Sequence, residues 1–193
     1  LGELQELSDS LVLGSGETLV ERAQILIDCF SSGVARCGMV AYDGIMELGW
    51  DTHAANHVQS QHFEGLFEGL GEIMSSLQST EDSNGNPLIE NVTVVVLSEM
   101  GRYPKYNTRG GREHWTFTSA MLMGSGVRGG QVIGGFDEYA AGQPTDLETG
   151  QVDDAGQYLV TGNVGATLLS LADMDPAEFI PNSDPILAAL EDS

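Results

Sequence analysis

Hydrophobic and polar residues alternate along this chain in two distinct patterns. Apolar positions three and four residues apart predict amphipathic helices over residues 16–32, 58–78 and 162–174. Short continuous apolar runs predict buried strands over residues 36–42, 92–97 and 117–123. Residues 134–156 are rich in Gly and Asp, which predicts a long irregular surface segment, and residues 185–190 predict a last short helix.

The predicted elements alternate between strand and helix. Such alternation is typical of an α/β fold with a mostly parallel sheet sandwiched by helices. The 193 residues can bury a sizeable core, and no repeat or linker divides them, so we expect a single α/β domain over residues 1–193. Ligands of such sheets bind at the carboxyl ends of the strands, so the residues after strands 36–42 and 92–97 are the first candidates for a site.

The chain carries 29 acidic residues against only seven Lys and Arg, a formal net charge of −22. This balance excludes nucleic acid as a partner, because phosphate binding needs many Lys and Arg side chains. It suits an exported protein, so we expect a periplasmic or extracellular location. No apolar run approaches the roughly 20 residues of a membrane span. The chain begins with Leu rather than Met, so we expect a processed segment or part of a longer protein.

Most of the basic residues are concentrated in one segment. Four of the seven fall within residues 98–115: Arg102, Lys105, Arg109 and Arg112. Their position beside Glu and His residues predicts a local anion site that works against the negative field of the molecule. Arg102 and Arg112 would hold the non-bridging oxygens of a phosphate or sulfate by forked hydrogen bonds. The alternative is a solvated loop that offsets the surrounding acidic residues.

Two carboxylates and two imidazoles lie on the loops at the same predicted sheet edge: Asp51, His53, Glu99 and His114. This donor set suits zinc or manganese. In an extended Asp-x-His segment both side chains project to one face, so one ion can bind both Asp51 and His53. Glu99 and His114 would complete the site from the neighbouring loop. The alternatives are a chance Asp-x-His and a local salt bridge of Glu99 with Arg102.

Three further features leave alternatives open. Cys29 and Cys37 either form a local disulfide, which implies an oxidising compartment, or are two buried free thiols. His57 and His62 stand at the start of a predicted helix, and we expect surface or capping residues there. The acidic segment offers oxygen ligands for calcium, with a solvated loop as the alternative. Its candidate ligands are Asp137, Glu138, Asp146, Asp153 and Asp154.

Three motifs occur in order along the chain: Gly49-Trp-Asp-Thr-His53, Ser98-Glu-Met-Gly-Arg-Tyr-Pro104 and Gly110-Gly-Arg-Glu-His-Trp115. With the Gly-rich residues 124–135 and with residues 166–176, they resemble the family of unknown function numbered 1501. That family is grouped with alkaline phosphatases and sulfatases. The resemblance extends from residue 37 onward, whereas residues 1–36, a predicted leading helix, match no motif of the family.

The resemblance implies an alkaline-phosphatase-like fold with a two-metal site, which binds a phosphate or sulfate ester beside a Ser, Thr or modified-Cys nucleophile. By this resemblance, Asp51, His53 and His114 belong to the first metal site and Glu99 to the second. In the superfamily the nucleophile and the other ligands lie on N-terminal strands that have no counterpart before residue 37. The chain therefore resembles the C-terminal portion of such a fold.

Two functions follow from these observations. The first is a metal-dependent hydrolase-like protein acting on phosphate or sulfate esters, or the metal-bearing half of one, although no nucleophile is visible in this chain. Its partners would be an anionic ester substrate and the missing N-terminal half or other subunits. The alternative is a non-catalytic secreted acidic protein, structural or binding, that retains the sulfatase-like fold.

Overall fold

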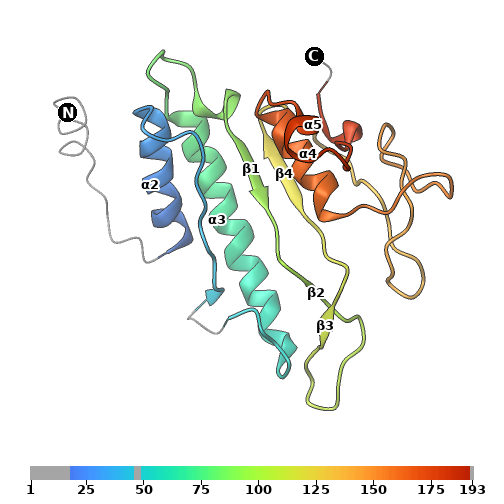
Figure 1. Cartoon of the computed structure of the whole chain (residues 1–193). Coiled ribbons are helices and arrows are strands. Elements are labelled where there is room, and N and C mark those ends of the chain that lie inside the picture. Colours follow the sequence, from blue (N-terminus) through green and yellow to red (C-terminus); the bar gives the residue numbers. More distant parts are fainter. Residues whose placement is uncertain (1–17, 46–48, 192–193) are drawn as a thin grey trace. The chain divides into compact units, whose positions relative to one another are not determined.

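Figure 1 shows the computed structural model of the chain, which describes residues 18–45 and 49–191. The chain divides into two compact units. Among the described residues, the first unit comprises residues up to 92 together with residues 105–113, and the second comprises residues 93–104 and 114–191. What the sequence predicts for residues 1–17 lies outside the described residues. None of the described helices is long and apolar enough to cross a membrane.

Helix α2 (Leu19–Ser31) confirms the first predicted helix. A capping box begins it: the Thr18 hydroxyl accepts a hydrogen bond from the Glu21 amide at 3.2 Å, and the Glu21 carboxylate accepts one from the Thr18 amide at 2.9 Å. These bonds satisfy amides that the start of a helix leaves unpaired, so the helix begins at a defined residue. Ala23 and Ile27 are its buried residues.

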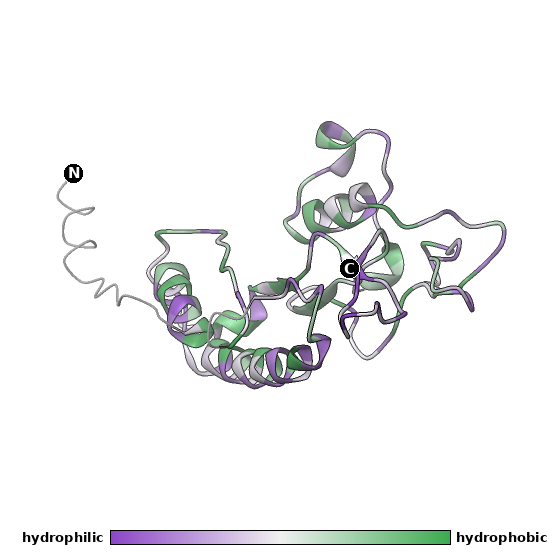
Figure 2. Cartoon of the chain, turned by 90° about the horizontal axis from the view of Figure 1, so that it is seen from below, coloured by the Kyte–Doolittle hydropathy of each residue, from purple (hydrophilic) through white to green (hydrophobic). Residues whose placement is uncertain are grey.

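Helix α3 (Gln59–Ser79) lies beside α2 and runs in the same direction (Figure 1). Residues of both kinds, hydrophobic and hydrophilic, are distributed around it (Figure 2). Three positions of the predicted apolar stripe are buried: Leu70, Ile73 and Leu77. The absence of a side chain at Gly69 lets the helices approach closely, because a Cβ there would lie 3.0 Å from the Leu19 side chain. Two short 3-10 helices flank α3: η2 (Asn56–Val58) and η3 (Leu88–Glu90).

The prediction of a buried strand over residues 36–42 is wrong. No strand forms there, and Met39 at its centre is 93% exposed. The segment is held instead by a side chain, since Arg22 Nη1 donates to the Ala41 carbonyl at 3.0 Å. A strand needs a neighbouring strand to satisfy its backbone groups, and the first unit contains none among its described residues.

The two cysteines of the first unit are free thiols. Cys29 lies near the end of α2 and is half-buried, whereas Cys37 is exposed in the segment that follows. Of the two alternatives drawn from the sequence, the structure therefore shows free thiols and no disulfide between Cys29 and Cys37. The thiol of Cys37 is exposed, whereas the sequence predicted two buried thiols.

The second unit contains two small antiparallel sheets. Strand β1 (Thr93–Val96) pairs with β4 (Met121–Gly124). Strand β2 (Gly101–Arg102) pairs with β3 (His114–Trp115). The sequence predicts the positions of β1 and β4, but it gives no signal for the two-residue strands.

The fold class predicted from the sequence is therefore wrong. Among the described residues there are only two-stranded antiparallel sheets, and no parallel sheet is sandwiched by helices. The reason lies in the connection from β1 to β4. Parallel neighbours need a crossover of a dozen or more residues, usually a helix, and all residues between these strands are described and form no helix. The chain instead turns back, and β4 pairs with β1 in the antiparallel direction.

Helices of the second unit follow its long irregular segment. Helix α4 (Thr161–Leu171) confirms the predicted helix, and α5 (Pro176–Phe179) packs against it. The last predicted helix is the 3-10 helix η4 (Leu187–Ala189). Around η4 a small apolar cluster is buried, whose members are Ile186, Ala188 and Ala189.

Hydrogen bonds from buried side chains join α4 to the segment before η4. The Thr167 hydroxyl donates to the Asn163 carbonyl at 2.7 Å and accepts from the Ile186 amide at 2.8 Å. Asn163 Nδ2 donates to the Asp184 carbonyl at 2.9 Å. Buried polar groups are stable only when they are paired, and these bonds therefore fix one arrangement of the second unit's carboxyl-terminal part.

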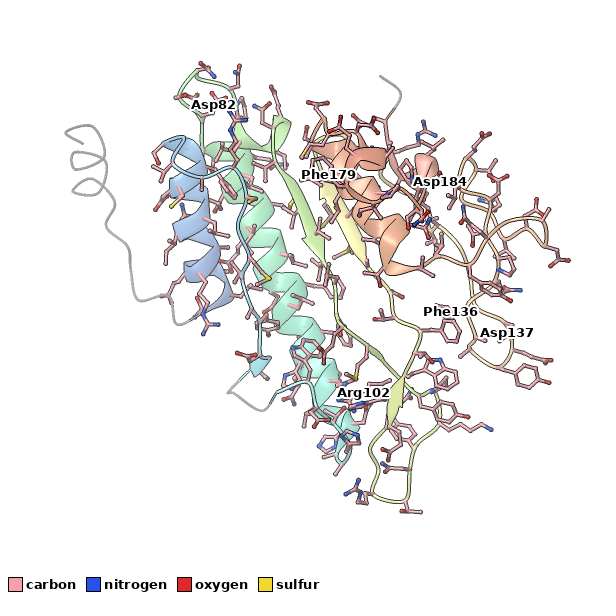
Figure 3. All side chains as sticks on the ribbon, viewed as in Figure 1. Asp82, Arg102, Phe136, Asp137, Phe179 and Asp184 are labelled. Atoms are coloured by element: carbon pink, nitrogen blue, oxygen red, sulfur yellow. The ribbon has the colours of Figure 1, made fainter. Side chains whose placement is uncertain are left out.

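The segment between β4 and α4 is irregular, as predicted for residues 134–156. Aspartates hold its turns: one oxygen of Asp137 accepts from the Tyr139 amide at 2.8 Å and from the Ala141 amide at 2.9 Å. Figure 3 shows Asp137 and Phe136 on this segment. Thr145 is wholly buried, and it exchanges backbone hydrogen bonds with Gln157 at 2.8 and 3.1 Å.

Candidate metal and anion site

Side chains of the Asp-x-His segment alternate between two faces. Thr52 is only 3% exposed, and its hydroxyl donates to Asn56 Oδ1 at 3.0 Å and accepts from Gln59 Nε2 at 2.8 Å. Because successive side chains of an extended segment point to opposite faces, its neighbours Asp51 and His53 lie on the other face. Their side chains are 73% and 32% exposed and contact each other.

His62, on the first turns of α3, is wholly buried and is not the surface or capping residue predicted from the sequence. Its Nδ1 accepts from the Ile45 amide at 3.1 Å, and its Nε2 lies 2.9 Å from the Gly49 carbonyl oxygen. Since Nδ1 accepts, Nε2 carries the proton and donates to this carbonyl. His62 thus fixes the chain just before Asp51. His57 is exposed, as predicted.

Trp50 packs the same segment against α3. Its ring centroid lies 5.1 Å from that of His62 and 5.0 Å from that of Phe63. The indole Nε1 donates to the Tyr42 carbonyl at 2.8 Å. Burial raises the pKa of the Tyr42 phenol above its ordinary value of 10.0. The inward-facing side chains therefore hold the backbone in the conformation that presents Asp51 and His53.

Residues 105–113 form a loop that lies directly against the Asp-x-His segment. The Arg112 amide donates to the Thr52 carbonyl at 3.0 Å, and the Asn56 amide donates to the Gly110 carbonyl at the same distance. Gly111 is buried between the two chain segments, where a Cβ would lie 2.1 Å from the carbonyl carbon of His53. Only glycine permits this approach of the two backbones.

Asn107 organises this loop. Its Oδ1 accepts from the Arg109 and Gly111 amides at 2.9 and 3.0 Å. Its Nδ2 donates to the His53 carbonyl at 2.9 Å and to Glu113 Oε1 at 2.7 Å. One side chain therefore fixes the turn, attaches it to His53 and orients Glu113.

His53 lies between two carboxylates. Its Nδ1 is 2.5 Å from Asp51 Oδ1, and its Nε2 is 3.4 Å from Glu113 Oε2. We call these three residues the His53 cluster. An imidazole with carboxylates at both nitrogens is a donor set that suits zinc or manganese.

Three basic residues of the predicted anion site belong to the same loop. The Arg112 guanidinium lies over the Tyr106 ring, 4.5 Å from its centroid, which is a cation–π contact. Lys105 and Arg109 are exposed on the loop. The structure thus places three cationic side chains on the loop that carries Glu113.

The other predicted site residues belong to the second unit. Arg102, labelled in Figure 3, lies opposite His114 in the β2–β3 sheet, and side chains of directly opposite residues share one face. Glu99 is exposed in the segment between β1 and β2. The metal set of Asp51, His53, Glu99 and His114 draws on both units and stays a prediction.

Carboxylates of the acidic segment take part in local turns. Asp146 Oδ1 accepts from the Glu148 and Thr149 amides, both at 2.8 Å, and Asp153 Oδ1 accepts from the Ala155 amide at 2.8 Å. The backbone bonds from Thr149 and Glu148 lower the pKa of Asp146 below its ordinary value of 3.8. These bonds account for the positions of the aspartates as turn formers, and calcium binding stays a prediction.

Sequence reasoning missed three residues of the site. Asn107 precedes a Gly-Gly pair by three residues, and Asn at the first with Gly at the fourth position is a turn signal in the sequence. Glu113 lies within the third motif, but no metal-binding role was predicted for it. His62 carried no signal, because its burial depends on a backbone segment distant in sequence.

The geometry defines a mixed α/β protein with the partly exposed His53 cluster. The family described as "Protein of unknown function (DUF1501)" matches residues 18–156, and the chain belongs to this family. Comparisons with curated proteins and with solved structures gave no match.

Proposed function

We propose that this chain is the metal-bearing part of a hydrolase that acts on phosphate or sulfate esters. The observation that carries the proposal is the position of His53 between Asp51 and Glu113, at 2.5 and 3.4 Å. The resemblance of the three motifs to family 1501, and the grouping of that family with alkaline phosphatases and sulfatases, also support it, because the first and third motifs contain these residues. Zinc and manganese are the proposed metals.

Particular side chains of the first unit have distinct roles in this proposal. A bound divalent ion would supply Lewis-acid polarisation of the ester oxygen. The cationic side chain of Arg112 would bind the non-bridging oxygens of the ester, assisted by Lys105 and Arg109. The buried residues Thr52 and His62 keep the metal-binding segment in place, so that the ligands need little reorganisation. In the second unit, Arg102, Glu99 and His114 are proposed to serve the same chemistry.

The negative charge of the chain raises the local concentration of cations and repels anions. An anionic ester would therefore bind only where metal and arginine reverse the sign of the local field. We propose that the protein works outside the cytoplasm, which the acidic composition supports.

Metal content tests the proposal first. The full chain, purified without chelator, is expected to contain about one or two divalent ions per chain when measured by plasma mass spectrometry. His53→Ala should lose the metal, whereas His57→Ala, an exposed histidine of the same unit, should retain it. Absence of metal from the wild-type chain, after incubation with zinc and manganese, would contradict the proposal.

Ester hydrolysis tests it next. The metal-loaded chain is assayed with p-nitrophenyl phosphate and p-nitrophenyl sulfate, and Arg112→Ala is expected to reduce kcat/KM roughly 100-fold. The matched control is Arg128→Ala, because Arg128 lies outside the three motifs. Metal binding without hydrolysis of either ester would favour the alternative function.

That alternative is a non-catalytic, acidic binding or structural protein. The observation that favours it is the use of carboxylates in the second unit, where Asp137, Asp146 and Asp153 accept bonds from their own turns. These aspartates shape the turns of a negatively charged surface segment.

A further inference from the structure

We propose that Glu113 is a ligand of the metal and that Asp51 is not. In this assignment the ion would be bound by His53 Nε2 and Glu113 Oε2, while Asp51 accepts a hydrogen bond from the protonated Nδ1 of His53 and positions the ring. The assignment rests on the proposed metal-binding function and deepens it. It differs from the ligand set drawn from the sequence, in which Asp51 and His53 bind the ion together.

The two distances from His53 distinguish the roles of the carboxylates. Two ligands of a tetrahedral zinc at bond lengths of 2.0–2.2 Å are about 3.3–3.5 Å apart. Nε2 of His53 and Oε2 of Glu113 are 3.4 Å apart, so an ion fits between them without movement of either atom. The same separation is longer than an ordinary N–H···O hydrogen bond, which spans about 2.7–3.2 Å.

Asp51 and His53 are too close to share an ion. At 2.5 Å, their atoms Oδ1 and Nδ1 would subtend an angle of only about 75° at a metal with bonds near 2.05 Å. The contact is a hydrogen-bonding distance instead. A carboxylate that accepts the free ring N–H of a metal-bound histidine fixes its tautomer and ring orientation, and raises its basicity.

Glu113 has the support that a ligand needs. Its Oε1 accepts from Asn107 Nδ2 at 2.7 Å, which leaves Oε2 turned to His53. The same amide nitrogen donates to the His53 carbonyl at 2.9 Å, so one side chain sets the separation of both proposed ligands. The close approach at Gly111 keeps the two backbones together.

A zinc or manganese ion held by these two side chains would need further ligands, which water or an ester oxygen could supply. Arg112 precedes Glu113 in the chain, so the proposed ligand and the proposed anion-binding residue are neighbours.

The test compares conservative variants of the two carboxylates in the full chain, using Zn²⁺ in calorimetric titrations and Co²⁺ as a spectroscopic probe. Glu113→Gln is expected to weaken Zn²⁺ binding by more than roughly 100-fold and to change the visible spectrum of bound Co²⁺, because a ligand is lost. Asp51→Asn should weaken binding by roughly 10- to 100-fold and leave the Co²⁺ spectrum unchanged. Glu68→Gln, an exposed glutamate on α3, is the matched control.

Each outcome decides the assignment. If Asp51→Asn changes the Co²⁺ spectrum while Glu113→Gln behaves like Glu68→Gln, Asp51 is the ligand and the inference is overturned. Circular dichroism of every variant establishes that it is folded, and Glu113→Asp gives a second measurement, with binding expected to fall because the shorter side chain retracts its oxygen. If the wild-type chain binds no Zn²⁺, or if His53→Ala binds it unchanged, the proposed function itself has failed.

Discussion

The two units of this chain use polar side chains in different ways. In the first unit, polar groups from distant parts of the sequence converge: Gln59 and His62 on α3 hold residues before and within the Asp-x-His segment, and Asn107 holds it from a third segment. In the second unit, aspartates such as Asp137 and Asp146 bond to amides two to four residues away. The long-range polar contacts of the first unit position the His53 cluster. Those of the second unit join α4 to residues 184–186, and its aspartates shape only their own loop.

This difference predicts where substitutions will affect function. A substitution in the first unit that breaks the long-range hydrogen bonds to the Asp-x-His segment should lower both the stability and the metal affinity. A substitution in the second unit that lowers the free energy of unfolding by the same amount should lower the stability alone. The variants below test this separation, beginning with the largest expected effect.

Gly111→Ala should have the largest effect. The added Cβ would overlap the backbone of His53, so the loop must move away, and we expect the free energy of unfolding to fall by about 3 kcal/mol. Zinc affinity should fall at the same time, because Glu113 and His53 separate. Denaturant unfolding and calorimetric titration measure the two effects.

Gly71→Ala is the control for this substitution. Gly71 lies on α3 with open space around the Cβ position, and alanine there should stabilise the helix by about 1 kcal/mol. If Gly111→Ala behaves like Gly71→Ala, the close approach of the two backbones does not matter for the site.

His62→Phe and Thr167→Val compare the units directly. His62→Phe leaves the Ile45 amide and the Gly49 carbonyl without their partner, and Thr167→Val does the same to the Ile186 amide. Each should lower the free energy of unfolding by about 1–3 kcal/mol. Only His62→Phe should also weaken zinc binding, by roughly 10-fold, since only His62 holds the metal-binding segment. Equal zinc affinities in the two variants would remove the functional difference between the units.

The smallest effect concerns acid stability, in which the units should behave alike. Backbone hydrogen bonds from Asn86 and Asn84 lower the pKa of Asp82 in the first unit, and those from Thr149 and Glu148 lower that of Asp146 in the second. A lowered pKa means that the folded state binds fewer protons than the unfolded state. The stabilisation is therefore present above the unfolded pKa, near 3.8, and is lost as pH falls through the lower folded value.

Asp82→Asn and Asp146→Asn test this expectation. Asparagine keeps an oxygen that accepts from the same amides but cannot be protonated in this range. Urea unfolding between about pH 6 and pH 2 should show a shallower loss of stability in each variant than in the wild-type chain. A slope identical to that of the wild type would mean that these turns do not contribute to acid unfolding.

Local sequence pattern predicted the helices well. The stretches that became α2, α3 and α4 have regular apolar spacing, and α2 also has a capping box at Thr18 and Glu21. The pattern failed at residues 36–42, because an apolar run does not specify whether a partner strand is available. It failed again in the sheet topology, which depends on how the chain between β1 and β4 returns.

For the site, too, the sequence predicted the local features and not the long-range contacts. Two-residue periodicity placed Asp51 and His53 on one face without any structure, and the clustered bases marked residues 98–115. No role in metal binding was predicted for Glu113, because its position beside His53 depends on a contact across 60 residues of chain.

The sequence by itself determined the helices, the irregular acidic segment, the pairing of Asp51 with His53 on one face and the family of the chain. These features depend on residues close together in the chain, or on motifs read directly. Tertiary structure alone decided the antiparallel sheets, the burial of His62 and the approach of Glu113 to His53. Those features arise where distant backbone segments meet, and packing and hydrogen bonding between the segments select them.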